Sequence, residues 1–190
     1  MRINEDDALI VTDVQNDFCP GGALPVPQGD AVVSPINRLV GKFETLVYSR
    51  DYHPEEHCSF SLDPRYCDGS WPYHCVQDTP GAEFHGDLRV PLDAVFIEKG
   101  TNPDKEAYSA FEDTDLEQIL RKKNIARLFI TGLALDYCVK ATALDALRLG
   151  FAVVVVEDAT RGISEDSSAA AKAELLAAGV TLCRVGDISS

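Results

Sequence analysis

The feature of this chain that most constrains its fold is a series of short apolar runs rich in Val, Ile and Leu. Most of these runs lack the alternation of polar and apolar residues that marks a strand with one face in water. Continuous runs of this kind are typical of parallel strands in a sheet that is covered on both faces. We therefore predict strands at residues 8–12, 45–49, 94–98, 127–131, 152–157 and 180–185.

Segments with apolar residues at helical spacing lie between these strands, and they predict helices at residues 30–43, 114–123, 137–149 and 167–178. Gly150 and Gly179 directly follow the last two. Glycine is a common stop signal there because it adopts a left-handed conformation without strain. The alternation of strand and helix predicts an α/β fold, with a doubly wound, mostly parallel sheet of about six strands and helices on both faces.

One long stretch interrupts this alternation. The segment from Asp51 to Leu92 is rich in Pro, His, Cys, Asp and Gly and shows no regular period. Aperiodic segments of such length inside a compact domain usually carry function. We therefore treat residues 1–190 as one domain with a substrate- and metal-binding loop insertion at about 52–92. The loop thiols are expected to pack within it, at Cys58, Cys67 and Cys75.

The charge of the chain excludes several classes of function. Its 190 residues include 17 Lys and Arg against 31 Asp and Glu, a formal net charge of −14. Nucleic acids and anionic membranes attract basic surfaces, so neither is expected as a partner. The first residues are acidic and lack an apolar signal core, which predicts a cytoplasmic protein whose thiols stay reduced. The sequence leaves homo-oligomer formation open.

Several polar residues directly follow the predicted strands, and ligands of open α/β sheets bind beyond the carboxyl ends of strands. Asp13 follows the first strand, Asp51 and His53 follow the second, the third runs into Lys99, and Cys138 begins the helix after the fourth. Each alone has an ordinary interpretation, such as a helix cap, a solvated turn or a small packed residue. Their convergence on one edge favours a site.

These residue types suit catalysis by a thiolate nucleophile. The Lys99 ammonium and a helix N-terminus near Cys138 are expected to lower the pKa of the Cys138 thiol. Asp13 can accept the thiol proton and later deliver it to a poor leaving group such as an amine. Backbone N–H groups on the turn before Cys138 could stabilise an oxyanion.

A second set of residues has the chemistry of a metal site. Asp51 and His53 leave the second strand, and His74 lies in the loop. Two imidazoles and a carboxylate suit Zn²⁺, Fe²⁺ or Mn²⁺. The spacing alone is weak support, because His53 and His57 could equally hydrogen-bond the loop backbone.

The chain resembles the nicotinamidases of the isochorismatase-like cysteine hydrolase superfamily. The resemblance covers nearly the whole chain and rests on motifs in the family's order and spacing: DVQNDFCPGG at 13–22, SRDYHP at 49–54, WPYHCVQ at 71–77, EKG at 98–100 and GLALDYCV at 132–139.

This resemblance implies an enzyme that hydrolyses nicotinamide, and also pyrazinamide, to the acid and ammonia in NAD salvage. It implies a cysteine thioester intermediate, with Asp13, Lys99 and Cys138 as catalytic residues. The oxyanion would rest on the N–H groups of Ala134 and Cys138. A cis peptide bond between Leu133 and Ala134 is expected with them.

The resemblance also implies one divalent metal ion that holds the pyridine nitrogen. Its ligands would be Asp51, His53 and His74. Zinc is the first candidate, with iron or manganese as alternatives. His57 matches a position that binds metal in only some members. Four aromatic residues match positions that line the ring pocket: Phe18, Trp71, Tyr108 and Tyr137.

Other activities fit the sequence less well. Isochorismatases share the fold without the cysteine, and carbamoylsarcosine- or ureidoacrylate-type amidohydrolases resemble the triad but generally lack the Asp-x-His metal set. A metal- or ligand-binding module without catalysis would not need Asp13, Lys99 and Cys138 together. A thiol redox protein would be expected to carry a paired-cysteine motif, and the chain has none.

Overall fold

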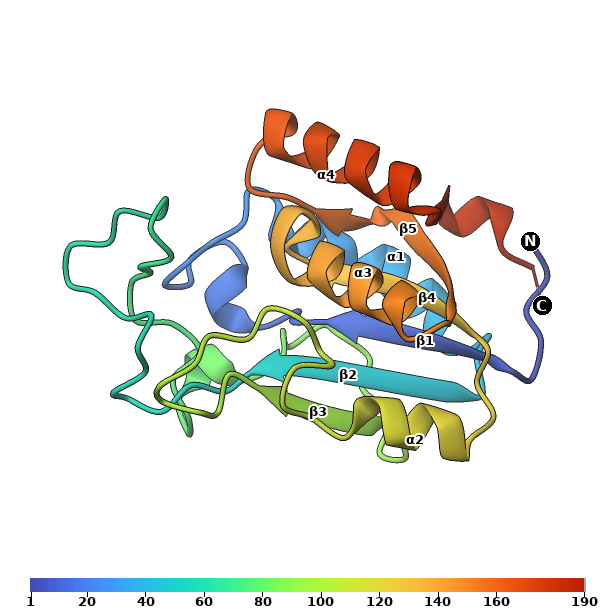
Figure 1. Ribbon diagram of the computed structural model, residues 1–190, viewed down its shortest axis with the longest axis horizontal. Helices are drawn as coiled ribbons and strands as arrows, with labels where there is room; N and C mark the ends of the chain where they lie inside the picture. The colour runs from blue at the N-terminus through green and yellow to red at the C-terminus, as the bar shows by residue number, and fades with distance from the viewer. Residues whose placement is uncertain (190) are drawn as a thin grey trace.

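A single sheet of six parallel strands, in the order β3-β2-β1-β4-β5-β6, organises the computed structural model, which describes residues 1–189 (Figure 1). The strands are β1 Asp7–Thr12, β2 Thr45–Asp51, β3 Val95–Lys99, β4 Arg127–Leu133, β5 Ala152–Arg161 and β6 Thr181–Cys183. The predicted doubly wound α/β fold is confirmed. The strand order reverses between β1 and β4, and such a reversal opens a crevice at the carboxyl ends of the strands.

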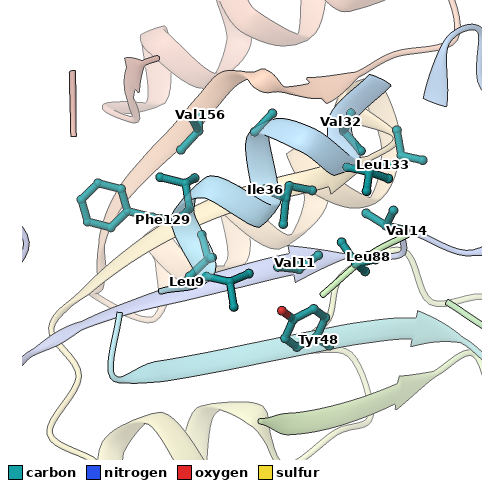
Figure 2. Packing of buried hydrophobic residues seen from close by; sticks show 14 of the residues in the cluster. Leu9, Val11, Val14, Val32, Ile36, Tyr48, Leu88, Phe129, Leu133 and Val156 are labelled. Atoms are coloured by element: carbon teal, nitrogen blue, oxygen red, sulfur yellow. The ribbon is translucent and has the colours of Figure 1, made fainter. Parts of the chain in front are cut away.

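Helices cover both faces of this sheet. Helix α1 (Val33–Val40) packs on one face, and α2 (Leu116–Lys122), α3 (Lys140–Arg148) and α4 (Glu165–Ala178) pack on the other. Side chains of β1 alternate between the two cores, as a strand period of two requires. Leu9 and Val11 join the core under α1, shown in Figure 2, whereas Ala8 and Ile10 join the opposite one.

The helix boundaries differ from the predicted ones for local reasons. Helix α4 begins at Glu165 rather than at residue 167, because the Ser164 hydroxyl accepts a hydrogen bond from the Ser167 N–H at 3.1 Å and caps the helix. It ends where predicted, with Gly179 at a φ of +103°. Helix α1 is shorter than the predicted 30–43, since a 3₁₀ turn occupies Gly29–Val32.

The loop between β2 and β3 lies beyond the carboxyl ends of the strands (Figure 1). Within the described residues its helical content is one 3₁₀ turn at Pro80–Ala82. Cys75 packs into the core under α1, so this part of the loop covers the sheet face where a crossover helix would otherwise lie. Cys58 and Cys67 are exposed, and their predicted packing was wrong.

None of the helices within residues 1–189 is both long enough and apolar enough to cross a membrane.

Candidate active site

The carboxyl ends of four neighbouring strands bring the predicted polar residues together. Asp13 directly follows β1, Asp51 and Lys99 end β2 and β3, and Cys138 lies in the helical turn after β4. Carboxylate and sulfur atoms of Asp13, Asp51 and Cys138 lie within 4.8 Å of one another. Because these strands are parallel neighbours, their carboxyl ends share one edge of the sheet, and residues far apart in sequence form one cluster there.

Lys99 lies at the centre of this cluster and is fully enclosed by it. Its Nζ lies 3.1 Å from Asp13 Oδ2 in an ion pair, and it donates hydrogen bonds to Asp51 Oδ1, to the Ala107 carbonyl at 3.0 Å and to Cys138 Sγ at 3.4 Å. Burial opposes the charge, but Asp13 and Asp51 raise the pKa of Lys99 well above its ordinary value. Lys99 is therefore an ammonium that touches the acid and the thiol at once.

The pKa values of the two carboxylates beside Lys99 are shifted in opposite directions. Burial raises the pKa of Asp13 above its ordinary value, although Lys99 and the Ser49 hydroxyl, which donates to Asp13 Oδ1 at 2.7 Å, oppose the shift. Burial also raises the pKa of Asp51, but Lys99 and then His53 outweigh it and hold that pKa well below its usual range. Asp13 is thus suited to proton transfer, and Asp51 to remaining a permanent anion.

The pKa of the Cys138 thiol is shifted in the direction opposite to the predicted one. Burial raises it well above its ordinary value, and the carboxylates of Asp13 and Asp51 add to the rise, whereas Lys99 lowers it. The prediction took account of the cation and the helix but not of the two anions and the desolvation. Any reaction of Cys138 as a thiolate would therefore need a base to remove the thiol proton.

Two histidines next to this cluster form, with Asp51, a group of side chains of the kind that bind metal ions. The Nε2 atoms of His53 and His74 lie 3.6 and 3.9 Å from Asp51 Oδ2. Their Nδ1 atoms contact the carbonyls of Gly100 at 2.9 Å and Pro72 at 2.8 Å. Because a carbonyl only accepts, each Nδ1 must carry the proton, which leaves each Nε2 lone pair facing Asp51.

These residues fit a divalent cation. His53 Nε2 is buried and has no hydrogen-bond partner among residues 1–189, which is costly for a polar atom unless a ligand engages it. With His74 Nε2 and the Asp51 carboxylate it forms a set of two nitrogens and an oxygen, as zinc and iron accept.

His57 is occupied differently from these residues. Its Nε2 donates to the Lys105 carbonyl at 3.1 Å, and its Nδ1 accepts from the Ser59 hydroxyl at 2.8 Å. Its ring lies 4.1 Å from the ring of His53, centroid to centroid. Both ring nitrogens of His57 are therefore engaged by Ser59 and Lys105 rather than by Asp51.

A cavity of about 440 Å³ opens onto Cys138 and Asp51. The four aromatic residues expected around the ring pocket all line it: Phe18, Trp71, Tyr108 and Tyr137. Trp71 Nε1 donates to the Tyr108 hydroxyl at 3.0 Å, and the Trp71 and Tyr137 rings meet edge-on with centroids 5.2 Å apart. The cavity therefore has an aromatic wall opposite polar reacting groups, a shape suited to a small flat ligand.

The turn that carries Cys138 has unusual backbone geometry. The Leu133–Ala134 peptide bond is cis, as predicted. A π-helical turn follows at Leu135–Val139, in which the Val139 N–H donates to the Ala134 carbonyl at 3.1 Å. Gly132 has a φ of +103°, and a Cβ there would lie 1.9 Å from the Thr12 carbonyl oxygen. Glycine is required at this position because β4 passes directly against β1.

Two polar side chains of the 13–22 motif support the site, and the sequence suggested no role for either. The Gln15 side chain accepts from the Asp51 N–H and donates to the Asp51 carbonyl, both at 2.8 Å. The Asp17 carboxylate accepts from the N–H groups of Ala23 at 3.0 Å and Cys75 at 2.7 Å. Gln15 thus fixes the end of β2, and Asp17 fixes the loop next to His74. Their place within the longest motif was the only signal.

Comparisons with known proteins agree with this geometry. A family model described as the isochorismatase domain matches residues 7–187. The chain is 43% identical to the nicotinamidase of Escherichia coli (strain K12), over 95% of each chain. It is 49% identical to the pyrazinamidase of Pyrococcus horikoshii, solved in complex with zinc, with a TM-score of 0.88 over 94% of this chain and 99% of that one.

A third similarity is to a structure with a bound small molecule. The protein described as PnC1 from L. infantum, solved in complex with nicotinate, superposes with a TM-score of 0.91 at 36% identity, over 100% of this chain and 98% of that one. Fold, sequence and the strand-end cluster agree. The chain therefore belongs to the isochorismatase family.

Proposed function

We propose that this chain is an amide hydrolase that converts nicotinamide to nicotinate and ammonia, accepts pyrazinamide as well, and serves NAD salvage. The observation that carries the proposal is the buried Lys99 ammonium, which contacts both Asp13 and Cys138. Lys99 also pairs with Asp51, the carboxylate that faces His53 and His74. The curated relatives named nicotinamidase and nicotinamidase/pyrazinamidase support the choice of substrates.

The proposed reaction begins with transfer of the Cys138 proton to Asp13. The thiolate attacks the carboxamide carbon, and the N–H groups of Ala134 and Cys138, both at the cavity wall, hold the oxyanion. Asp13 then protonates the amine as the C–N bond breaks, which releases ammonia and leaves a thioester. Water then attacks the thioester carbon as Asp13 takes its proton, the C–S bond breaks to release the acid, and Asp13 returns the proton to the Cys138 sulfur. The Lys99 ammonium stabilises the charges throughout.

We assign Asp51, His53 and His74 as the ligands of one divalent metal ion. When bound, the ion would take the pyridine nitrogen and orient the carboxamide toward Cys138. Zinc is our first choice because the P. horikoshii relative was solved with zinc, and iron or manganese would suit the same nitrogens and oxygen. Phe18, Trp71, Tyr108 and Tyr137 would enclose the ring.

We further propose that the chain acts as one domain, with the loop at about 52–92 as an insertion that completes the site. The described strands form one sheet, and the family match runs through the loop. We propose the cytoplasm as its location, because a catalytic thiol there is kept reduced. The partner is a small carboxamide, and formation of a homo-oligomer would not be needed to complete the cluster.

Ammonia release from a panel of carboxamides tests the proposal. Metal-loaded protein is expected to hydrolyse nicotinamide and pyrazinamide, to hydrolyse benzamide much more slowly because its ring has no nitrogen, and to lose activity when the metal is stripped. His53→Ala should lose bound metal on elemental analysis, whereas His85→Ala, which removes an imidazole outside the cavity, should keep it. Equal rates on benzamide, or full activity after stripping, would contradict the proposal.

A further inference from the structure

Glu106 is a charged side chain of the cavity wall that the proposed reaction does not use. It lies in the segment after β3 and lines the same cavity as Asp51 and Cys138. One of its carboxylate oxygens lies within 4.8 Å of ring nitrogens of His53 and His57. Its negative charge therefore faces the space where a ligand of Cys138 would bind.

The carboxylate of Glu106 is held in place by its own backbone neighbour. The Ala107 N–H donates to Glu106 Oε1 at 3.0 Å, and the Ala107 carbonyl accepts from Lys99 Nζ at 3.0 Å. One residue thus links the position of Glu106 to the catalytic ammonium. A fixed charge acts on a ligand more consistently than a mobile surface charge does.

No cationic side chain of the described cavity lining offsets Glu106. The described lining includes two carboxylates, Asp51 and Glu106, and no lysine or arginine. Asp51 pairs with Lys99, whereas none of the ion pairs formed by residues 1–189 includes Glu106. Burial, with a smaller contribution from the Glu106 charge, raises the pKa of the neighbouring Tyr108 hydroxyl to about 12, so the Glu106 charge also acts on the aromatic wall.

We propose that Glu106 is a specificity-determining residue that lets the cavity favour a neutral carboxamide over the carboxylate product. The inference rests on the proposed function, in which the reaction creates a negative charge where none existed in the substrate. Ring contacts serve substrate and product alike, and a bound cation or the Lys99 ammonium would attract the anionic product, so neither disfavours the product. A carboxylate of the protein repels only the product, and thereby speeds its release.

The expected size of the effect follows from Coulomb's law. Two like charges about 10 Å apart, at an effective dielectric constant of about 20, disfavour binding by about tenfold. Glu106→Gln keeps the shape and the hydrogen-bond acceptor but removes the charge. The inhibition constant of nicotinate should therefore fall by about tenfold, while the KM for nicotinamide and the content of bound metal change by less than about twofold.

Product inhibition of the metal-loaded protein tests this proposal. Nicotinate is titrated against nicotinamide hydrolysis in wild type, Glu106→Gln, Glu106→Asp and Glu56→Gln. Glu106→Asp keeps the charge, so nicotinate should inhibit this variant as weakly as it inhibits wild type. Glu56→Gln removes an equal charge from an exposed loop position outside the cavity and serves as the control. Equilibrium binding of nicotinate and nicotinamide to Cys138→Ala, with and without Glu106→Gln, gives the same comparison without turnover.

Stronger nicotinate binding confined to Glu106→Gln supports the proposal. An unchanged inhibition constant, or equal tightening of nicotinate and nicotinamide, contradicts it. Should Glu106→Gln fail to fold, Glu106→Ala serves the same comparison. Wild-type protein that releases no ammonia from nicotinamide would instead refute the proposed function, so the two failures are distinguishable.

Discussion

At the scale of single residues, the site depends on a lysine that is enclosed by its partners. Lys99 contacts Asp13, Asp51, Cys138 and one backbone carbonyl. Removing one member of a buried ion pair leaves the other uncompensated, at a typical cost of about 3–5 kcal/mol. We therefore regard the two carboxylates and the ammonium as one interdependent unit, with a net charge of −1 when all three are ionised, in which burial raises the pKa of Asp13.

The hydrogen bond from Ser49 to Asp13 gives a test of the proposed base. The Ser49 hydroxyl contributes to lowering the pKa of Asp13, so Ser49→Ala should raise that pKa further. Asp13 must be ionised to accept the thiol proton, and a higher pKa means that it is protonated at higher pH. The acid limb of the kcat/KM profile should therefore move to higher pH. Ser34→Ala, at an exposed position on α1, should leave the profile unchanged. An acid limb that stays in place or moves to lower pH would count against Asp13.

The residues of the site were partly predictable, because the carboxyl ends of parallel strands meet at one edge. That rule alone predicts that Asp13, Asp51, Lys99 and Cys138 lie together. It could not show that Lys99 would pair with Asp51 as well as with Asp13, since that depends on side-chain directions at the ends of β2 and β3. The predicted direction of the shift in the Cys138 pKa was wrong because it left out burial and the charges of Asp13 and Asp51.

At the scale of elements, strands and helices were predictable and the loop was not. Continuous apolar runs identify buried strands by themselves, whereas the segment between β2 and β3 has no period from which to place its residues. His74 reaches the site because residue 76 forms a parallel bridge with residue 53, in which the His53 N–H donates to the Cys75 carbonyl at 3.0 Å. Its residue type made His74 a candidate ligand, and only the resemblance to a family set it apart from the other histidines of the loop.

A glycine directly after β3 sets the position of one proposed metal ligand, His53. Gly100 has a φ of +64°, and a Cβ at this position would lie 2.4 Å from His53 Cε1. Gly100→Ala should therefore displace the imidazole and weaken metal binding by about 10–100-fold, as losses of supporting contacts do. Metal titration followed by elemental analysis measures the change.

Gly41→Ala is the matched control for that substitution. Gly41 follows α1 at a φ of −81°, and a Cβ there would meet nothing within 4 Å. Metal binding should be unchanged in this variant, and the free energy of unfolding should stay equal or rise slightly. Gly100→Ala protein with wild-type metal affinity would show that His53 is not a ligand.

At the scale of the whole molecule, the site joins parts of the chain that are otherwise separate. Asp51 belongs to the sheet, whereas His53 and His74 belong to the loop beyond its carboxyl edge (Figure 1). A cation held by all three would tie the loop to the sheet. Metal binding should therefore stabilise the folded protein as a whole, through mass action on the native state.

Thermal unfolding measures this coupling. Free metal at about 100 times its dissociation constant should add about 2.7 kcal/mol to the free energy of unfolding. For a domain of this size that raises Tm by about 5–10 °C. The rise should vanish in His53→Ala and persist in His85→Ala. Equal shifts in wild type and His53→Ala would place the stabilising metal elsewhere.

We propose that Asp13 and Cys138 act as one catalytic unit around Lys99. It is tested most directly by the kcat for nicotinamide of Asp13→Ala, Cys138→Ala and the double variant, with folding checked by circular dichroism. Groups that act together lose nearly all activity on the first substitution. The account predicts a loss of at least about 10³-fold in each single variant and no further loss in the double variant. A single variant with appreciable turnover, or losses that multiply, would contradict it.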